Sequence, residues 1–177
     1  MDNPLAQAFE MLFDARDTDH DGVLERKDFE QTGILVKAYQ LPSSDHRIRL
    51  LEDGYKIFWD QLLPHSGSES DRMTKEQFVQ ALVMAPENHR GDPLGQQMVF
   101  GLCDIADTSG DYTLDKDEFV RFAKVLGGDE ERALSAFTEL DNGNGVISRQ
   151  EMFNAFRDYL HGSDLQKPGG VLLGTLM

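Results

Sequence analysis

Apolar residues recur at helical spacing along most of this chain. Near its start, Leu5, Phe9 and Leu12 fall on one face of a helix over 4–16, which Asn3 can cap. No run alternates with period two for long enough to predict a substantial sheet. Seven further helices are predicted over residues 26–39, 44–63, 74–85, 93–106, 115–126, 129–140 and 148–161. The pattern therefore predicts an all-α protein whose eight helices form four pairs.

The segment 17–28, between the first two helices, carries acidic residues at alternate positions. A glycine, Gly22, follows them at position 6, where a sharp turn needs positive φ, and the apolar Leu24 stands at position 8. This spacing matches the calcium loop of an EF-hand, whose alternate side chains direct oxygens at one hard cation. The proposed ligands are Asp17, Asp19, Asp21, the backbone carbonyl of Val23, and Asp28.

A second copy of the pattern spans residues 107–118. Its position 6 is Tyr112 instead of glycine, which costs roughly 1 to 2 kcal/mol if the residue takes positive φ. We expect the loop to bind in spite of this cost, because the ligand pattern is intact. The ligands would be Asp107, Ser109, Asp111, the carbonyl of Thr113, and Glu118.

A third copy, residues 141–151, has eleven members, one fewer than the usual loop. The simplest alignment omits the outward-facing position 2. The ligands would then be Asp141, Asn142, Asn144, the carbonyl of Val146, and Glu151. The alternative is a loop too short to close on an ion.

Residues 66–77 form a fourth, degenerate loop between the first two copies. Gln77 stands where a bidentate carboxylate is needed and Asp71 replaces the glycine, so we expect no calcium there. EF-hand loops pair through short strands. The expected pairs are Val23–Leu24 with Arg72–Met73, and Thr113–Leu114 with Val146–Ile147.

The charge of the chain narrows its partners. A formal net charge of −15 makes nucleic acid and anionic membrane surfaces poor ligands and divalent cations good ones. The single cysteine, Cys103, excludes an internal disulfide and is expected to be a buried, inert thiol. The start of the sequence does not resemble a secretory signal, and the apolar runs fall short of a membrane span. We therefore expect a cytoplasmic monomer.

The order of one complete loop, one degenerate loop with long flanking helices, and two further loops resembles the sarcoplasmic calcium-binding protein group, including bacterial calerythrin. Residues 158–162 (DYLHG) and 170–174 (GVLLG) add to the resemblance. It implies two EF-hand pairs in one compact fold and a tail that folds back onto the domain. The corresponding division is residues 1–88, 89–162 and 163–177. It also implies calcium and magnesium binding without enzymatic activity.

We interpret the chain as a calcium buffer or modulator that binds two or three calcium ions. Asp28 is one methylene shorter than the usual glutamate, so the first loop is expected to accept magnesium as well. One alternative is a calcium sensor that exposes an apolar surface to a protein target. A second is a carrier of an apolar ligand in a central cavity, although a single tryptophan argues against photoprotein chemistry.

Overall fold

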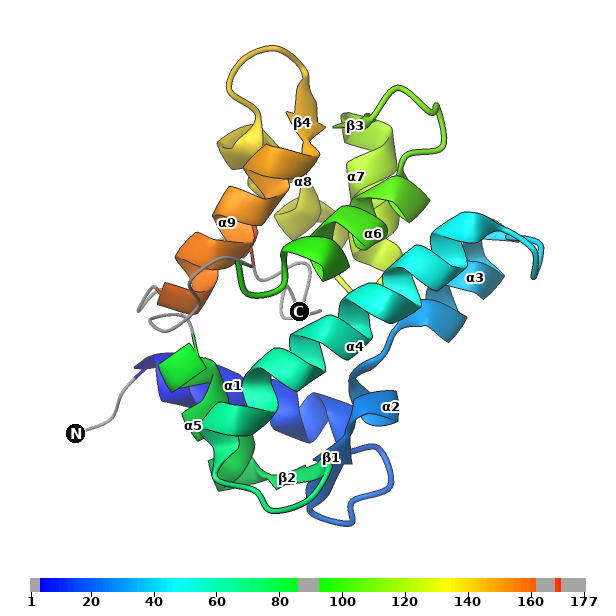
Figure 1. Ribbon diagram of the computed structural model, residues 1–177. Coiled ribbons are helices and arrows are strands. Elements are labelled where there is room, and N and C mark those ends of the chain that lie inside the picture. The colour runs from blue at the N-terminus through cyan, green and yellow to red at the C-terminus, as the bar shows by residue number, and fades with distance from the viewer. Residues whose placement is uncertain (1–3, 86–92, 162–167, 170–177) are drawn as a thin grey trace.

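The computed structural model describes residues 4–85, 93–161 and 168–169. Within them the chain forms nine helices and four three-residue strands, so the all-α prediction is confirmed (Figure 1). In chain order the elements are α1 (Pro4–Arg16), β1 (Val23–Glu25), α2 (Arg26–Phe29), α3 (Thr32–Tyr39), α4 (His46–Ser66), β2 (Arg72–Thr74), α5 (Lys75–Met84), α6 (Gln96–Ala106), β3 (Thr113–Asp115), α7 (Lys116–Val125), α8 (Glu130–Leu140), β4 (Val146–Ser148) and α9 (Arg149–His161).

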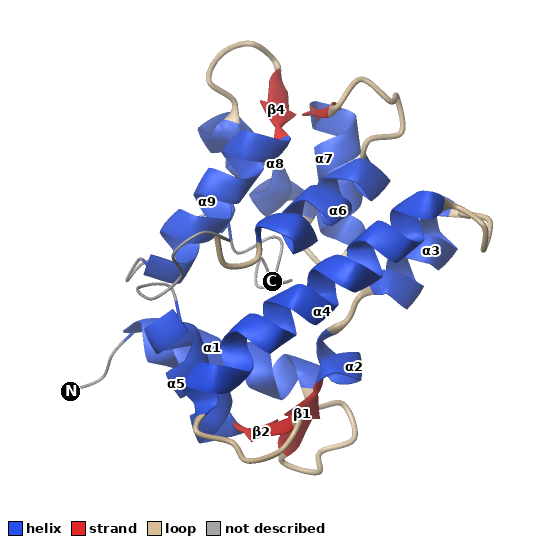
Figure 2. Ribbon diagram, in the orientation of Figure 1, coloured by secondary structure: helices blue, strands red, loops and turns tan. Residues whose placement is uncertain are grey.

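The four strands form two antiparallel pairs, β1 with β2 and β3 with β4, at opposite ends of the molecule (Figure 2). Leu24 lies opposite Met73, and Leu114 lies opposite Ile147. All four side chains are almost completely buried. The loops therefore pair as predicted, with their position 8 residues in the core.

The helix predicted over 26–39 is divided into α2 and α3. Glu30 has an extended backbone, with φ −68° and ψ 130°. Phe29 and Leu35 are six residues apart, so a continuous helix would place them about 120° apart on its circumference. The break allows both side chains to be buried. The helices predicted over 44–63 and 93–106 are confirmed with shifted ends, since α4 spans His46–Ser66 and α6 begins at Gln96.

The two halves of the molecule meet where α4 crosses α6 (Figure 1). At this crossing the backbones approach closely because each helix contributes a glycine. A Cβ at Gly54 would lie 2.8 Å from Cα of Met98, and a Cβ at Gly101 would lie 3.0 Å from Cα of Leu51. The ring of Phe58 also meets Phe156 of α9, with centroids 6.2 Å apart. The halves therefore share one core.

Aromatic side chains fill that core on the α4 side. Phe29 contacts the rings of Tyr55, Phe58, Trp59 and Phe78 at centroid distances of 5.3 to 6.5 Å. Cys103 is buried as expected, and desolvation raises the pKa of its thiol well above the usual range.

The predicted boundary between residues 88 and 89 lies outside the described residues, as does the tail 163–177 apart from residues 168 and 169. Gly169 is buried against the α9 backbone at Ala155. The division into 1–88, 89–162 and 163–177 remains a prediction.

Candidate metal centre

The first loop gathers three carboxylates at the C-terminal end of α1. Oxygens of Asp17, Asp19 and Asp21 lie within 4.8 Å of one another. Asp17 is buried and directs its oxygens into the loop, while Asp19 and Asp21 are exposed. Asp28 does not belong to this cluster, and its Oδ2 accepts a hydrogen bond from the N–H of Glu25 at 2.9 Å. The structure therefore brings together three of the four proposed carboxylate ligands.

Loops 17–28, 107–118 and 141–151 share the same internal hydrogen bonds. In each, the first aspartate accepts a hydrogen bond from the backbone N–H at position 6, which curls the loop around its oxygens. These bonds run from Gly22 to Asp17 (3.1 Å), from Tyr112 to Asp107 (2.8 Å) and from Gly145 to Asp141 (2.9 Å).

Two further bonds repeat in the same three loops. The position 7 N–H donates to the side chain at position 5, from Val23 to Asp21 (3.0 Å), from Thr113 to Asp111 (2.9 Å) and from Val146 to Asn144 (3.1 Å). The position 9 N–H donates to the carboxylate at position 12, from Glu25 to Asp28 (2.9 Å), from Asp115 to Glu118 (3.1 Å) and from Ser148 to Glu151 (2.7 Å). The three loops therefore have one local architecture.

The loop 107–118 is closed by Glu118, which is buried. Its Oε1 accepts from the N–H groups of Thr108 and Ser109 at 2.9 and 2.8 Å, so the carboxylate reaches across the loop. Tyr112 takes the left-handed conformation that glycine usually supplies, with φ +68°, and its side chain is exposed. A hydrogen bond from the Thr113 hydroxyl lowers the pKa of Asp111, which favours its charged form.

In the loop 141–151, Asp141 occupies the place of the first ligand despite the missing residue. Its Oδ1 accepts from three successive N–H groups, those of Gly143, Asn144 and Gly145, each at 2.9 Å. Asn142 donates from Nδ2 to Oε1 of Glu151 at 2.5 Å, so positions 3 and 12 meet across the loop. The alignment without position 2 therefore has its positions 3 and 12 in contact, and the binding of an ion by this loop stays a prediction.

The ligand positions of residues 66–77 hold neutral side chains: Ser66, Ser68, Ser70 and Gln77. The hydroxyl of Ser68 donates to the carbonyl of Arg72 at 2.6 Å, and Asp71, at the glycine position, accepts from the indole N–H of Trp59 at 3.1 Å. Gln77 accepts from the N–H of Thr74 at 2.9 Å, so an amide oxygen replaces the closing carboxylate. The loop keeps its fold without carboxylates at the ligand positions.

The three acidic loops fit a hard divalent cation. Their expected ligand atoms are carboxylate, amide, hydroxyl and carbonyl oxygens, which calcium and magnesium prefer, and among the described residues the carboxylates of Asp17, Asp19 and Asp21 alone form a group of three within 4.8 Å. Hydrogen bonds from the N–H and hydroxyl of Ser148 lower the pKa of Glu151, so this carboxylate is ionised at neutral pH.

One charged contact at the first loop was missed by the sequence analysis. Arg72 of β2 donates from Nη2 to Oδ2 of Asp21 at 2.7 Å, and its Nε lies 3.1 Å from Oε1 of Glu25. The strand register places Arg72 opposite Glu25, and this pairing is the feature from which the contact could have been expected.

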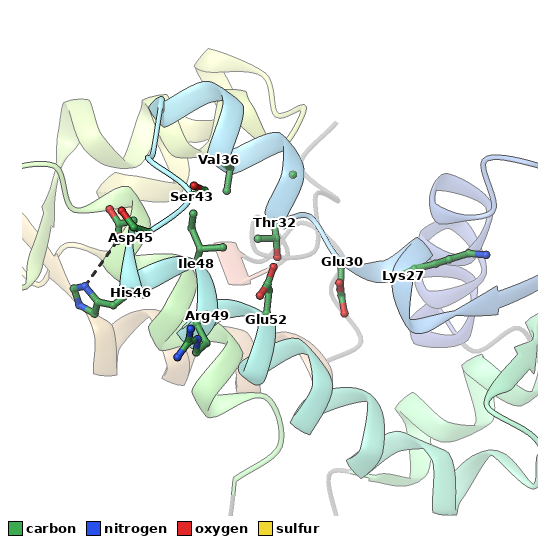
Figure 3. A pocket seen from close by; sticks show the side chains of 12 residues that line it. Lys27, Glu30, Thr32, Val36, Ser43, Asp45, His46, Ile48, Arg49 and Glu52 are labelled. Atoms are coloured by element: carbon green, nitrogen blue, oxygen red, sulfur yellow. Dashed lines mark ion pairs between the residues drawn. The ribbon is translucent and has the colours of Figure 1, made fainter.

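An open groove of about 760 Å³ lies between α3 and α4 and reaches Lys27 at the end of the first loop (Figure 3). Its lining carries charges of both signs, and the ion pair drawn joins His46 and Asp45 at 3.9 Å. The lining residues are Lys27, Glu30, Thr32, Gly33, Val36, Ser43, Ser44, Asp45, His46, Ile48, Arg49 and Glu52. Because these residues include both acidic and basic side chains, the groove does not gather charge of one sign around a single point.

These loops and their strand pairs define an EF-hand protein, and comparison with known proteins narrows the class. No protein-family model matches the chain. Calerythrin from Saccharopolyspora erythraea is 30% identical over 156 residues, which cover 85% of this chain and 88% of calerythrin. The chain belongs to the calerythrin family of EF-hand proteins, a group of calcium-binding proteins that are not enzymes.

Two solved structures show the same fold. A sarcoplasmic calcium-binding protein from amphioxus has a TM-score of 0.70 at 18% identity, and 98% of each chain is covered. Magnesium-loaded apo-berovin, a ctenophore photoprotein, has a TM-score of 0.70 at 24% identity over 87% of each chain. In that protein all three calcium-binding loops bind magnesium ions.

The described residues, 4–85, 93–161 and 168–169, contain no helix with both the length and the apolar character needed to cross a membrane.

Proposed function

We propose that loops 17–28, 107–118 and 141–151 each bind one calcium ion and that loop 66–77 binds none. The observation that carries this proposal is a pair of hydrogen bonds repeated in the three acidic loops, from the position 6 N–H to the first aspartate and from the position 7 N–H to the side chain at position 5. These bonds orient the first and fifth side chains, so binding has fewer groups left to order. The amide of Gln77 and the serine hydroxyls leave the other loop without comparable charge.

The protein acts as a calcium buffer, because its apolar helix faces are already covered. The glycine crossing of α4 and α6 brings the two EF-hand pairs together through backbone contact, and Phe58 and Phe156 join their cores. A sensor must open a hydrophobic groove for its target. The exposed large apolar residues belong to five helices and one loop: Met11, Ile34, Leu50, Val83, Met84, Tyr112 and Leu134.

The carrier alternative has less support. The rings of Phe29 and Phe58 are stacked at 5.3 Å, and Trp59, which is 1% exposed, packs against the same cluster. These side chains fill the space that an apolar ligand would occupy.

A dye that fluoresces on apolar surfaces distinguishes the buffer from the sensor. We expect calcium to saturate the loops, as followed by calorimetry, with little change in dye fluorescence. Saturation accompanied by a large fluorescence increase would establish the sensor instead. A small apolar molecule that co-purifies with the protein would identify a carrier.

The first loop also binds magnesium. Asp28 is short and lies outside the carboxylate cluster, so it reaches an ion with one oxygen more readily than with two. A shell of six oxygens at short distance suits magnesium, whose bonds are about 2.0 to 2.1 Å against about 2.3 to 2.6 Å for calcium. The magnesium bound by berovin supports this assignment by analogy.

The magnesium assignment is tested by calcium titration at fixed millimolar magnesium, with Asp28→Glu as the comparison. Magnesium should weaken calcium binding at the first loop of the native protein much more than in the variant. Equal competition in both proteins would exclude a special role for Asp28.

The proposed setting is the cytoplasm, and the protein works as a monomer. Three calcium ions would change its net charge from −15 to −9, so the loaded protein still repels nucleic acid and anionic membranes.

A further inference from the structure

Arg72 reaches from the second hand into the first loop. Its guanidinium donates to Oδ2 of Asp21 at 2.7 Å, while the other oxygen of Asp21 accepts from the N–H of Val23 at 3.0 Å. Each oxygen of this position 5 ligand therefore already holds a donor. The one that the loop backbone leaves free for an ion is the one that Arg72 contacts.

The backbone of Arg72 is fixed by the second hand itself. It pairs with Glu25 in the two-stranded sheet, and its carbonyl accepts from the hydroxyl of Ser68 at 2.6 Å. The guanidinium is about half exposed, but its stem begins at a fixed point beside the first loop. The contact with Asp21 therefore follows from the pairing of the two loops.

A calcium ion and a guanidinium compete for the same oxygen of Asp21. Shared coordination would bring two positive centres close together, so the ion binds best after Arg72 has left. Glu25 gives the displaced guanidinium a place to go, because its Oε1 already lies 3.1 Å from Nε.

We infer that Arg72 is an internal cation that weakens calcium binding at the first loop, and that the degenerate second hand sets the affinity of its neighbour in this way. The inference rests on the proposed function of residues 17–28. An exposed ion pair is worth up to about 1 kcal/mol, which corresponds to about a fivefold change in dissociation constant. The second hand would thus have a role without binding an ion.

The test compares Arg72→Gln with Lys75→Gln in the full chain. Both variants remove one positive charge from the second hand, but Lys75 pairs with Asp14, which lies outside the first loop. Calcium is titrated against a chelator of known affinity, and occupancy of the first loop is followed at the Gly22 amide resonance by NMR. This readout is specific because the Gly22 N–H donates to Asp17 within the loop.

Arg72→Gln should tighten calcium binding at the first loop about fivefold, whereas Lys75→Gln should change it less than twofold. Equal effects of the two variants, or weaker binding in Arg72→Gln, would overturn the inference. Arg72→Lys keeps the positive charge but loses the planar guanidinium, so its calcium affinity at the first loop should lie between those of the native protein and Arg72→Gln. This variant decides the question if Arg72→Gln does not fold. A native protein whose Gly22 resonance ignores calcium would instead contradict the proposed function.

Discussion

Gly54 gives the sharpest test of how the two halves are joined. A Cβ at this position would lie 2.8 Å from both Cα and N of Met98, whereas ordinary contacts begin at 3.4 Å. The obstruction is backbone and cannot rotate aside, so Gly54→Ala must push α4 and α6 apart by about 0.6 Å.

The cost of this separation exceeds the gain in helix propensity. Overpacking typically costs about 1 to 3 kcal/mol, and replacing a helical glycine by alanine returns at most about 1 kcal/mol. Because backbone meets backbone, we place the cost in the upper half of that range and expect a net loss of about 1 to 2 kcal/mol. For a chain of this size this lowers the melting temperature by about 2 to 8 °C.

Gly33→Ala is the matched control. Gly33 also lies in a helix, α3, but a Cβ there meets nothing within 4 Å. The control should be about 0.5 kcal/mol more stable than the native protein. Thermal unfolding of both variants in calcium should therefore show shifts of opposite sign. Equal upward shifts would show that the close crossing of α4 and α6 does not hold the halves together.

Three further predictions concern charge. Asp19→Asn should raise the melting temperature in chelator, because it removes the repulsion of Asp19 with Asp17 and with Asp21, about 0.9 kcal/mol each at 4.8 Å in a water-like dielectric. In calcium it should lower the melting temperature, because a ligand is lost. A decrease in both conditions would contradict the repulsion argument. Glu118→Gln should remove one bound calcium ion in calorimetry, while Gln77→Glu adds none, since its loop has serines at ligand positions 1, 3 and 5; a gained ion would show that Gln77 alone silences that loop. The hydrogen bond from Arg47 lowers the pKa of Asp45 to about 2, so its stabilising effect is complete above its unfolded pKa of about 3.9 and is lost as pH falls toward 2. Acid unfolding in chelator should accordingly be less steep for Asp45→Asn across this interval, and parallel curves would refute the assignment.

The local features of the loops followed from the sequence because they depend on short spacings. Counting from Asp17 makes Leu24 position 8 of its loop, and Met73 is position 8 of the neighbouring loop. The two residues do lie opposite each other in the strand pair. The eleven-residue loop was aligned by omitting one outward position, and in this alignment Asp141 accepts the same position 6 bond as Asp17 and Asp107, while ion binding there stays a prediction. Repeated local chemistry can be recognised without tertiary information.

Features set by packing between distant segments were not predictable in the same way. The break before α3 depends on burying both Phe29 and Leu35, although the weak helix formers Thr32 and Gly33 were a signal for it. Gly54 has no distinguishing feature within α4 itself, because its role depends on the close approach of Met98 in α6. The contact between Arg72 and Asp21 joins residues of different hands and required the strand register.

The number of calcium ions bound per chain shows how many of the four loops are working sites. Native mass spectrometry and calorimetry at saturating calcium, without magnesium, should give three ions for the native protein and two for Glu151→Gln. The variant keeps the size of the side chain but loses the charge that closes the shortened loop. A native stoichiometry of two that Glu151→Gln leaves unchanged would show that residues 141–151 do not bind an ion. A stoichiometry of four would show that residues 66–77 also bind one, in spite of the neutral side chains at their ligand positions.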